Sequence, residues 1–389
     1  MEEQAPMDEA PKAAAVAAND DELTGDIVVG MQYASLAITD DQPDTLKNVG
    51  KMNPWHIEAL KMITGSEEEA HAPLSTILAK HMNLECDAII DKQGTTPGGH
   101  FLDTQGYIAH NDEVIVLAFR CTTSFYDWLT NFDTTSSEWE IAEDVAQGYS
   151  GYCSALEGLT CCGTSEHKPR VHTGFYNNFL SIVPELKQHV EPLLAPDQPP
   201  RKLFVVGHSL GAGIANMAAC YFLLQFDWNV LPHRLVSVTA GSPRSCQGSM
   251  RNLVQEELER YGSHKTAFCR IRRNQDVVTT VPPKILGFKH IGRLVYITDD
   301  NRIELQVQDS DDHDVDEEKV EDVEFKGIPS TEEEDDDDDD DAENPHKPTK
   351  YEKTVSKIPT PFRDHMPDFY LKPMRIARHE LFPVELLVG

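Results

Sequence analysis

Short apolar runs, each bounded by polar turn residues, recur between residues 86 and 304. The runs Val114 to Phe119 and Leu203 to Val206 are continuous and of strand length, a pattern typical of strands buried on both faces of a sheet. The same texture predicts further strands at residues 88–90, 106–109, 235–238, 267–271 and 295–297.

Helical patterns alternate with these strands. Apolar residues at helical spacing, beginning with Phe175 and Phe179, predict a helix from Val171 to Leu194. Further helices are predicted over residues 54–83 and 210–226. Strands that alternate with helices build βαβ units, so the predicted fold class is α/β, with a mostly parallel central sheet flanked by helices.

Strong acidity marks one internal segment. The chain has 389 residues, with 34 basic and 66 acidic side chains and a formal net charge of −32. Residues 309–343 alone hold 21 acidic and 2 basic residues, including seven consecutive aspartates. Such a run cannot bury itself, so we predict a disordered acidic insertion over residues 305–350. The charge argues against nucleic acid as a partner, because phosphates repel it, and favours a basic protein as a partner of the acidic run.

The remaining residues divide into three parts. Residues 1–25 lack apolar periodicity and predict a disordered acidic N-terminal tail. Residues 26–85 are expected to form a helical N-terminal extension. The α/β domain comprises residues 86–304 and 351–389, and the second of these ranges regains apolar residues that are expected to pack back on the core.

Three features bear on location. No apolar run reaches the roughly 20 residues that cross a bilayer. The first residues are acidic, whereas a signal peptide begins with basic residues. The 8 cysteines are scattered along a long chain, which indicates reduced thiols. We therefore expect a cytoplasmic protein without a transmembrane segment.

The strongest chemical signal is Gly207-His208-Ser209-Leu210-Gly211. This Gly-x-Ser-x-Gly sequence lies between a buried strand and a helix, the context of a sharp turn that exposes a nucleophilic serine. Glycines at both ends remove side chains that would clash in such a turn. The pattern predicts Ser209 as a nucleophile, and the alternative is a glycine-rich turn with a helix-capping serine.

A serine hydroxyl needs a base to take its proton and an acid to orient that base. In this architecture the acid and then the histidine follow the serine along the chain. Asp276 follows a predicted strand, which favours it as the acid over a reading as a capping aspartate. The C-terminal segment offers His365 and His379 as candidates for the base, and spacing alone does not choose between them. No cofactor and no metal is needed for this chemistry.

The tetrahedral oxyanion needs hydrogen-bond donors. One is expected to be the backbone N–H of Leu210, which follows the nucleophile. The other is expected after the strand at residues 114–119, from a hydroxyl residue within residues 120–124.

Seven short motifs occur in a fixed order: Asp103 to Tyr107, Ala118 to Ser124 with Trp128, Val171 to Phe175, Val206 to Gly213, Ala240 to Arg244, Asp276 before Pro282-Pro283, and Asp364-His365 before Tyr370. With these motifs the chain resembles the class 3 (fungal-type) lipases of the α/β-hydrolase fold, with some similarity to diacylglycerol lipases. The resemblance implies Ser209 as nucleophile, Asp276 as orienting acid and His365 as base. It also implies Thr122 and Leu210 as the oxyanion donors.

The chain departs from the family pattern in three places. Cys121 stands where the family has glycine, next to the oxyanion donor, so its side chain is expected to narrow or tilt that loop. Residues 129–170, where the family carries its lid, are longer than usual and are our lid candidate, with a structural loop packed on the sheet as the alternative. The acidic insertion is also foreign to the family core.

The expected function is serine-dependent hydrolysis of carboxylic esters in acylglycerol lipids, of the triacylglycerol or diacylglycerol lipase type. The expected partner is a lipid ester substrate at a lipid–water interface, with peripheral attachment to membranes or lipid droplets. Two alternatives remain open: a phospholipase A1-type lipid esterase, and a catalytically silent hydrolase-fold protein that uses its acidic tract for interactions.

Overall fold

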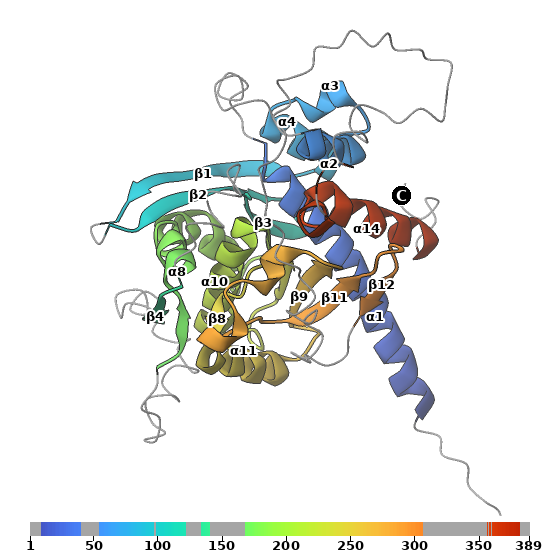
Figure 1. Cartoon of the computed structure of the whole chain (residues 1–389). Coiled ribbons are helices and arrows are strands. Elements are labelled where there is room, and N and C mark those ends of the chain that lie inside the picture. Colours follow the sequence, from blue (N-terminus) through green and yellow to red (C-terminus); the bar gives the residue numbers. More distant parts are fainter. Residues whose placement is uncertain are drawn as a thin grey trace, which may run out of the picture.

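A sheet of eight strands forms the centre of the molecule, seen in a computed structural model (Figure 1). Its order is β1-β2-β3-β6-β7-β9-β11-β12, and β3, β6, β7, β9 and β11 run parallel to one another. The structure describes residues 9–39, 54–96, 99–121, 134–140, 168–305, 356, 358 and 360–381. The predicted α/β class with a mostly parallel central sheet is confirmed.

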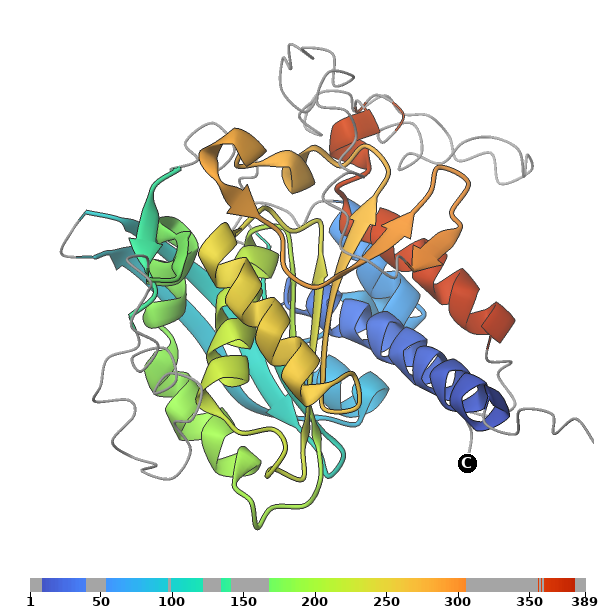
Figure 2. The same ribbon diagram turned by 90° about the horizontal axis from the view of Figure 1, so that it is seen from below.

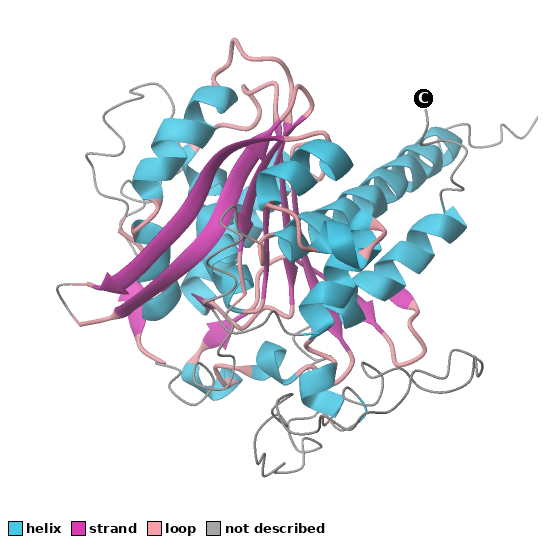
Figure 3. Cartoon of the chain, turned by 90° about the horizontal axis from the view of Figure 1, so that it is seen from above, coloured by secondary structure: helices cyan, strands magenta, loops and turns pink. Residues whose placement is uncertain are grey.

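Each strand predicted from the apolar runs lies within an observed strand. The parallel strands are β3 (Val114–Phe119), β6 (Lys202–His208), β7 (Arg234–Ala240), β9 (Thr266–Arg273) and β11 (Arg293–Ile297). The antiparallel strands are β1 (Glu85–Thr95), β2 (Phe101–His110) and β12 (Ile303–Leu305), of which β1 and β12 form the two edges. The long β1–β2 ribbon extends beyond its neighbours at one edge (Figures 1 and 3).

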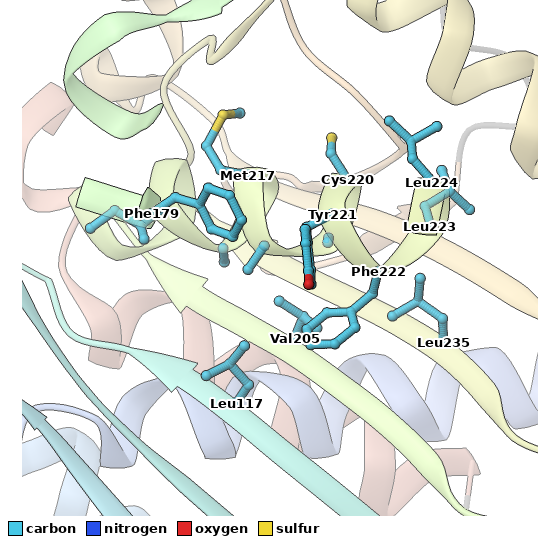
Figure 4. Close-up of a cluster of buried hydrophobic side chains, with 14 of the residues drawn as sticks. Leu117, Phe179, Val205, Met217, Cys220, Tyr221, Phe222, Leu223, Leu224 and Leu235 are labelled. Carbon is cyan, nitrogen blue, oxygen red and sulfur yellow. The ribbon is translucent and has the colours of Figure 1, made fainter. Parts of the chain in front are cut away.

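Helices cover both faces of the sheet (Figure 2). One face packs against α8 (Thr173–Leu180), α10 (Leu210–Gln225) and α11 (Gly248–Tyr261). The other packs against α1 (Glu9–Leu36), α2 (Pro54–Thr64) and α14 (Pro367–Leu381). Successive strand residues point to opposite faces, so Leu117 joins the first core and Val116 the second. Figure 4 shows the first core, where side chains of α10 pack on Leu117 and Val205.

Shorter elements connect these layers. The helical pieces are α3 (Glu67–Ala70), α4 (Leu74–Ile77), η1 (Leu78–Met82), α9 (Val183–Glu185), η2 (Leu186–Val190), η3 (Glu191–Leu194), η4 (Val277–Thr280), η5 (Lys284–Leu286) and α13 (Thr360–Arg363). A second, small sheet has the order β10-β8-β5-β4 and comprises β10 (Phe288–Lys289), β8 (Cys246–Gln247), β5 (Arg170–His172) and β4 (Ser136–Glu138). As expected, the described part of residues 351–389 packs on the core, through α14.

The predicted disorder of residues 1–25 is wrong for residues 9–25, which form the first part of α1. Leu23, Ile27 and Met31 of this helix are buried against the sheet. Two of its carboxylates form ion pairs with Lys202 and Arg234, the first residues of the central strands β6 and β7. Asp26 lies 2.8 Å from Lys202 Nζ and 2.7 Å from Arg234 Nη1.

Glu22 contacts the same two bases at 2.9 and 2.8 Å. Glu22 and Asp26 of α1 therefore have partners that lie far away along the chain, and these contacts, which local periodicity does not reveal, stabilise the helix. Residues 1–8 lie outside the described part.

The helix predicted over residues 171–194 is also corrected. Its first residues form strand β5, and α8 begins at Thr173, where the His172 ring accepts a hydrogen bond from the N–H of Gly174. The remainder breaks into α9, a π-helical turn and a 3-10 turn. Pro184 and Pro192 lie in this stretch, and proline has no N–H to continue a helix.

The lid candidate is described only at its ends. Residues 134–140 and 168–170 contribute to the β4–β5 pair, and Trp139 is buried against Tyr176 and Phe179. These ends do not decide between a lid and a structural loop packed on the sheet, and the lid stays a prediction. Residues 129–133 and 141–167 lie outside the described residues, as do residues 306–350 of the predicted acidic insertion. Among the helices that the structure describes, none has the length and apolar character needed to cross a membrane.

Candidate active site

Ser209 occupies the turn between β6 and α10, in a backbone conformation that side chains rarely adopt, with φ 59° and ψ −126°. The flanking glycines allow this turn to pack. A Cβ at Gly207 would lie 2.3 Å from the carbonyl oxygen of Gly211, and a Cβ at Gly211 would lie 2.4 Å from that of Phe119. Strain of about 1–3 kcal/mol is held here by the surrounding core, which fixes the direction of the hydroxyl.

Three predicted side chains meet at the carboxyl edge of the parallel strands. His365 Nε2 lies 2.8 Å from Ser209 Oγ, and His365 Nδ1 lies 2.9 and 3.0 Å from the two carboxylate oxygens of Asp276. Ser209 follows β6, Asp276 follows β9, and His365 lies in the turn between α13 and α14. The structure thus brings together side chains that are 156 and 89 positions apart.

The Asp276 carboxylate is completely buried, and its oxygens accept hydrogen bonds from three donor groups. The donors are His365 Nδ1–H, the N–H of Val278 at 2.8 Å and the hydroxyl of Tyr370. Burial alone would raise the pKa of this carboxyl. The adjacent imidazole and the donated hydrogen bonds outweigh burial and hold the pKa below its ordinary value, so Asp276 remains a carboxylate.

Gly241 provides the space for the hydrogen-bonded pair of Asp276 and His365. It follows β7 with φ 55°, and a Cβ there would lie 2.8 Å from an Asp276 oxygen and from the His365 ring. The Tyr370 hydroxyl, which donates to Asp276, is itself fixed, because it accepts a hydrogen bond of 3.2 Å from the N–H of Arg273. The motifs contained both residues, but only their contacts show that they position the acid.

The central part of the chain matches a known protein family. Residues 116–286 match the family model described as Lipase (class 3). This match confirms the resemblance to the class 3 lipases. The matched range includes Ser209 and Asp276 but ends before His365, which tertiary structure brings to them. The match and the sheet topology agree with the predicted α/β-hydrolase fold.

Individual relatives of the class 3 lipase region are distant. The secreted mono- and diacylglycerol lipase 2 of Gibberella zeae is 26% identical over 213 residues, which are 53% of this chain and 48% of that protein. The lipase of Rhizomucor miehei is 26% identical over 231 residues, 59% of this chain and 54% of that protein.

The chain therefore spans about half the length of the curated relatives it matches. Among solved structures, the mono- and diacylglycerol lipase of Aspergillus oryzae has a TM-score of 0.46 at 20% identity, over 72% of this chain and 85% of that one.

Of the two oxyanion donors that the class 3 lipase pattern implies, one is described. Leu210 is buried and is the first residue of α10, where helix N–H groups lack intrahelical partners. Thr122 lies outside the described residues. His379, the rival base, lies on α14, but its side chain is likewise outside the described part. Within the described ranges, no cluster of three or more His, Cys, Asp or Glu residues is arranged to hold a metal ion.

Cys121, the departure from the class 3 lipase pattern, has a partner from the N-terminal extension. Its sulfur lies 3.8 Å from Nε2 of His56, a buried residue of α2. Burial raises the pKa of the Cys121 thiol to about 11, so the thiol is neutral at neutral pH. The sequence did not single out His56, because nothing in its local pattern indicates a contact 65 positions away.

Three buried histidines predict acid sensitivity of the fold. Burial lowers the pKa of His56, His208 and His290 in the folded chain, whereas an unfolded histidine has a pKa of about 6.5. Below that pH the unfolded chain therefore binds protons that the folded chain does not. We expect the free energy of unfolding to fall by up to about 4 kcal/mol per pH unit between pH 6.5 and 5.

Urea unfolding at several pH values measures this slope. His290→Gln removes one histidine whose pKa is lowered and should reduce the slope by up to about 1.4 kcal/mol per pH unit. Equal stability of the wild-type chain at the two ends of this range would contradict the prediction.

Proposed function

We propose that the chain is a serine carboxylic ester hydrolase that acts on acylglycerol lipids through an acyl-enzyme. The observation that carries the proposal is the continuous hydrogen-bonded chain from Ser209 through His365 to a buried Asp276 carboxylate. A serine held against an imidazole whose second nitrogen is bound to a carboxylate is the arrangement that activates a hydroxyl for acyl transfer.

We propose one step of the reaction for each side chain. His365 Nε2 takes the Ser209 proton as the hydroxyl oxygen attacks the ester carbonyl, and Asp276 stabilises the resulting imidazolium. The N–H of Leu210, together with Thr122, is proposed to stabilise the oxyanion. His365 then protonates the leaving alcohol, and a water molecule, activated by the same imidazole, releases the acid from the acyl-enzyme.

The substrate class rests on the relatives. The two curated relatives named above are lipases by name, and one is a mono- and diacylglycerol lipase, which supports acylglycerol esters as substrates. A catalytically silent fold is the competing hypothesis, and the alignment of the three buried side chains argues against it.

A lipid panel tests the function. Hydrolysis of a monomeric short-chain ester, emulsified triacylglycerol and diacylglycerol, and phospholipid vesicles would be measured with labelling by a fluorophosphonate probe. We expect labelling and hydrolysis of acylglycerols. Phospholipid hydrolysis alone would favour the phospholipase A1 alternative. The absence of hydrolysis and of labelling would leave the silent interaction protein.

For location we propose the cytoplasm, with peripheral attachment to membranes or lipid droplets. Cys121, Cys220, Cys246 and Cys269 carry free thiols, which supports a reducing compartment. A basic protein remains our proposed partner for the acidic run.

A rigid apolar turn supports the lipid interface as partner. Ile285 is 92% exposed and Leu286 is 44% exposed, in the turn that follows Pro283. The buried Arg244 holds the preceding segment, since its Nη1 donates to the carbonyl oxygen of Pro282 at 2.8 Å. Such a turn presents apolar surface that is already ordered, so inserting it into lipid costs little conformational entropy.

Replacing Ile285 by serine should weaken binding to neutral phosphatidylcholine vesicles about tenfold, because apolar area is then no longer removed from water. Vesicle sedimentation measures the binding, and hydrolysis of a monomeric ester should stay unchanged. Val230→Ser is the matched control, since Val230 is 59% exposed in the turn before β7, at the opposite edge of the sheet. Equal binding by Ile285→Ser and wild type would contradict the prediction.

A further inference from the structure

A second buried imidazole lies directly against the proposed base. His208 immediately precedes Ser209, and its ring stacks on that of His365, with centroids 4.8 Å apart and planes 26° from parallel. His208 Nε2 also lies 2.8 Å from the carbonyl oxygen of His365. His208 thus contacts both the ring and the main chain of His365, and the mechanism above uses neither contact.

The carbonyl partner determines the protonation of the His208 ring. A carbonyl oxygen only accepts, so Nε2 carries the proton and donates it. Nδ1 then holds a lone pair, and it is buried without a hydrogen-bond partner among the described residues. Burial, followed by the proximity of His365, lowers the pKa of His208 to about 3, so this ring stays neutral at neutral pH.

Three further titratable groups face the His208 ring, those of Tyr370, Asp276 and His56. The ring of Tyr370 meets it edge-on, with centroids 5.7 Å apart. The negative charge of Asp276 raises the pKa of His208, but burial and His365 lower it by more. His56 of α2 is a third buried imidazole, whose pKa is lowered by burial and then by His208.

The position of His365 explains why such support is needed. His365 lies in the short turn between α13 and α14, where its N–H donates to the carbonyl oxygen of Phe362 at 3.2 Å. During acyl transfer this ring becomes an imidazolium. A neighbouring ring that also took a proton would repel it, whereas a neutral ring presents a π face that attracts a cation.

We infer that His208 is a positioning residue for His365. Its Nε2–H fixes the carbonyl oxygen of the turn that carries the base, and its neutral ring, stacked on His365, does not compete for the proton. The inference rests on the proposed function, since it assigns His208 a part in setting the geometry of the same hydroxyl, base and acid.

Two substitutions separate the two contacts. His208→Phe keeps an aromatic ring but has no donor, and His208→Gln keeps an amide N–H near the position of Nε2 but has no ring. We expect His208→Phe to lower kcat for a monomeric water-soluble ester by about 10- to 100-fold, because small displacements of a catalytic group have effects of this size. KM should change by less than about twofold, and His208→Gln should recover most of kcat.

His233 provides the matched control. It is equally buried, its Nδ1 accepts from the N–H of Arg201 at 3.1 Å, and it lies just before β7, at the edge of the sheet away from Ser209. His233→Phe removes a buried hydrogen bond and should therefore lower the thermal midpoint of unfolding. It should leave kcat unchanged.

Wild-type kcat in folded His208→Phe, or equal losses of kcat in His208→Phe and His208→Gln, would overturn the inference. If His208→Phe fails to fold, His208→Gln decides, and a loss of kcat greater than about tenfold in that variant would overturn it.

A readout independent of turnover separates this inference from the proposed function. The Nδ1 proton of His365, hydrogen-bonded to Asp276, should give a far-downfield proton resonance in the wild-type chain. We expect His208→Phe to broaden or shift it and His208→Gln to preserve it. A chain that hydrolyses no ester and takes no label would refute the proposed function, whereas an unchanged resonance in His208→Phe would refute the role of His208.

Discussion

Replacing Ser209 by alanine is expected to lower ester hydrolysis by about 10⁵-fold or more and to abolish fluorophosphonate labelling, because the attacking oxygen is removed. Alanine has the same Cβ, so the positive φ of the turn gains no new clash, and the thermal midpoint should stay close to that of the wild type. Steady-state hydrolysis of a monomeric ester, gel-based labelling and thermal unfolding measure the three quantities.

A serine away from the site provides the control for this substitution. Ser181 ends α8, and its hydroxyl donates to the carbonyl oxygen of Asn178 at 2.6 Å. Ser181→Ala should keep full labelling and activity. Retained labelling of Ser209→Ala would show that another residue is the nucleophile and would remove the basis of the proposed mechanism.

The second large effect is expected at Asp276. Asp276→Asn should lower kcat by about 10⁴-fold, because an amide presents N–H groups where the carboxylate accepts, and it therefore favours the wrong tautomer of His365. The three donors around this buried position cannot all be satisfied by the single carbonyl oxygen of asparagine. Steady-state kinetics with the monomeric ester measure the loss.

Asp364 is the matched carboxylate for this experiment. It is also buried, and it accepts from the N–H of Gln275 at 3.3 Å and lies 3.5 Å from Arg273 Nε. Asp364→Asn should lower stability while kcat changes only a few-fold, since the site assigns Asp276 to the imidazole. Activity of Asp276→Asn equal to that of Asp364→Asn would contradict the assignment of the acid.

Local sequence patterns were enough to predict the strands, the fold class and two residues of the site. Strands buried on both faces must be continuously apolar, so their positions could be predicted from the runs alone, and the α/β class followed from their alternation with helices. The turn at Ser209 was also predictable, because its backbone leaves no room for a side chain two positions before and two positions after the serine, at Gly207 and Gly211. Asp276 followed from its place after a strand.

Contacts between distant residues lay beyond local patterns. The choice of His365 over His379 came from the family motif and not from spacing, and the structure then placed the His365 ring against Ser209. The helix over residues 9–25 was missed because this stretch lacks apolar periodicity, and because Glu22 and the adjoining Asp26 look solvated until the fold brings Lys202 and Arg234 to them. The two-residue strands β8 and β10 carry too few residues to show any periodicity.

The sequence by itself determined which residues have the chemistry of an acyl-transfer site and which segments form the sheet. Only tertiary structure placed the His365 ring against Ser209, the Tyr370 hydroxyl on Asp276 and the His208 ring on His365. The reason is physical: propensity and hydrophobic period act over a few residues, whereas a hydrogen bond between residues 208 and 365 exists only after the whole sheet has formed.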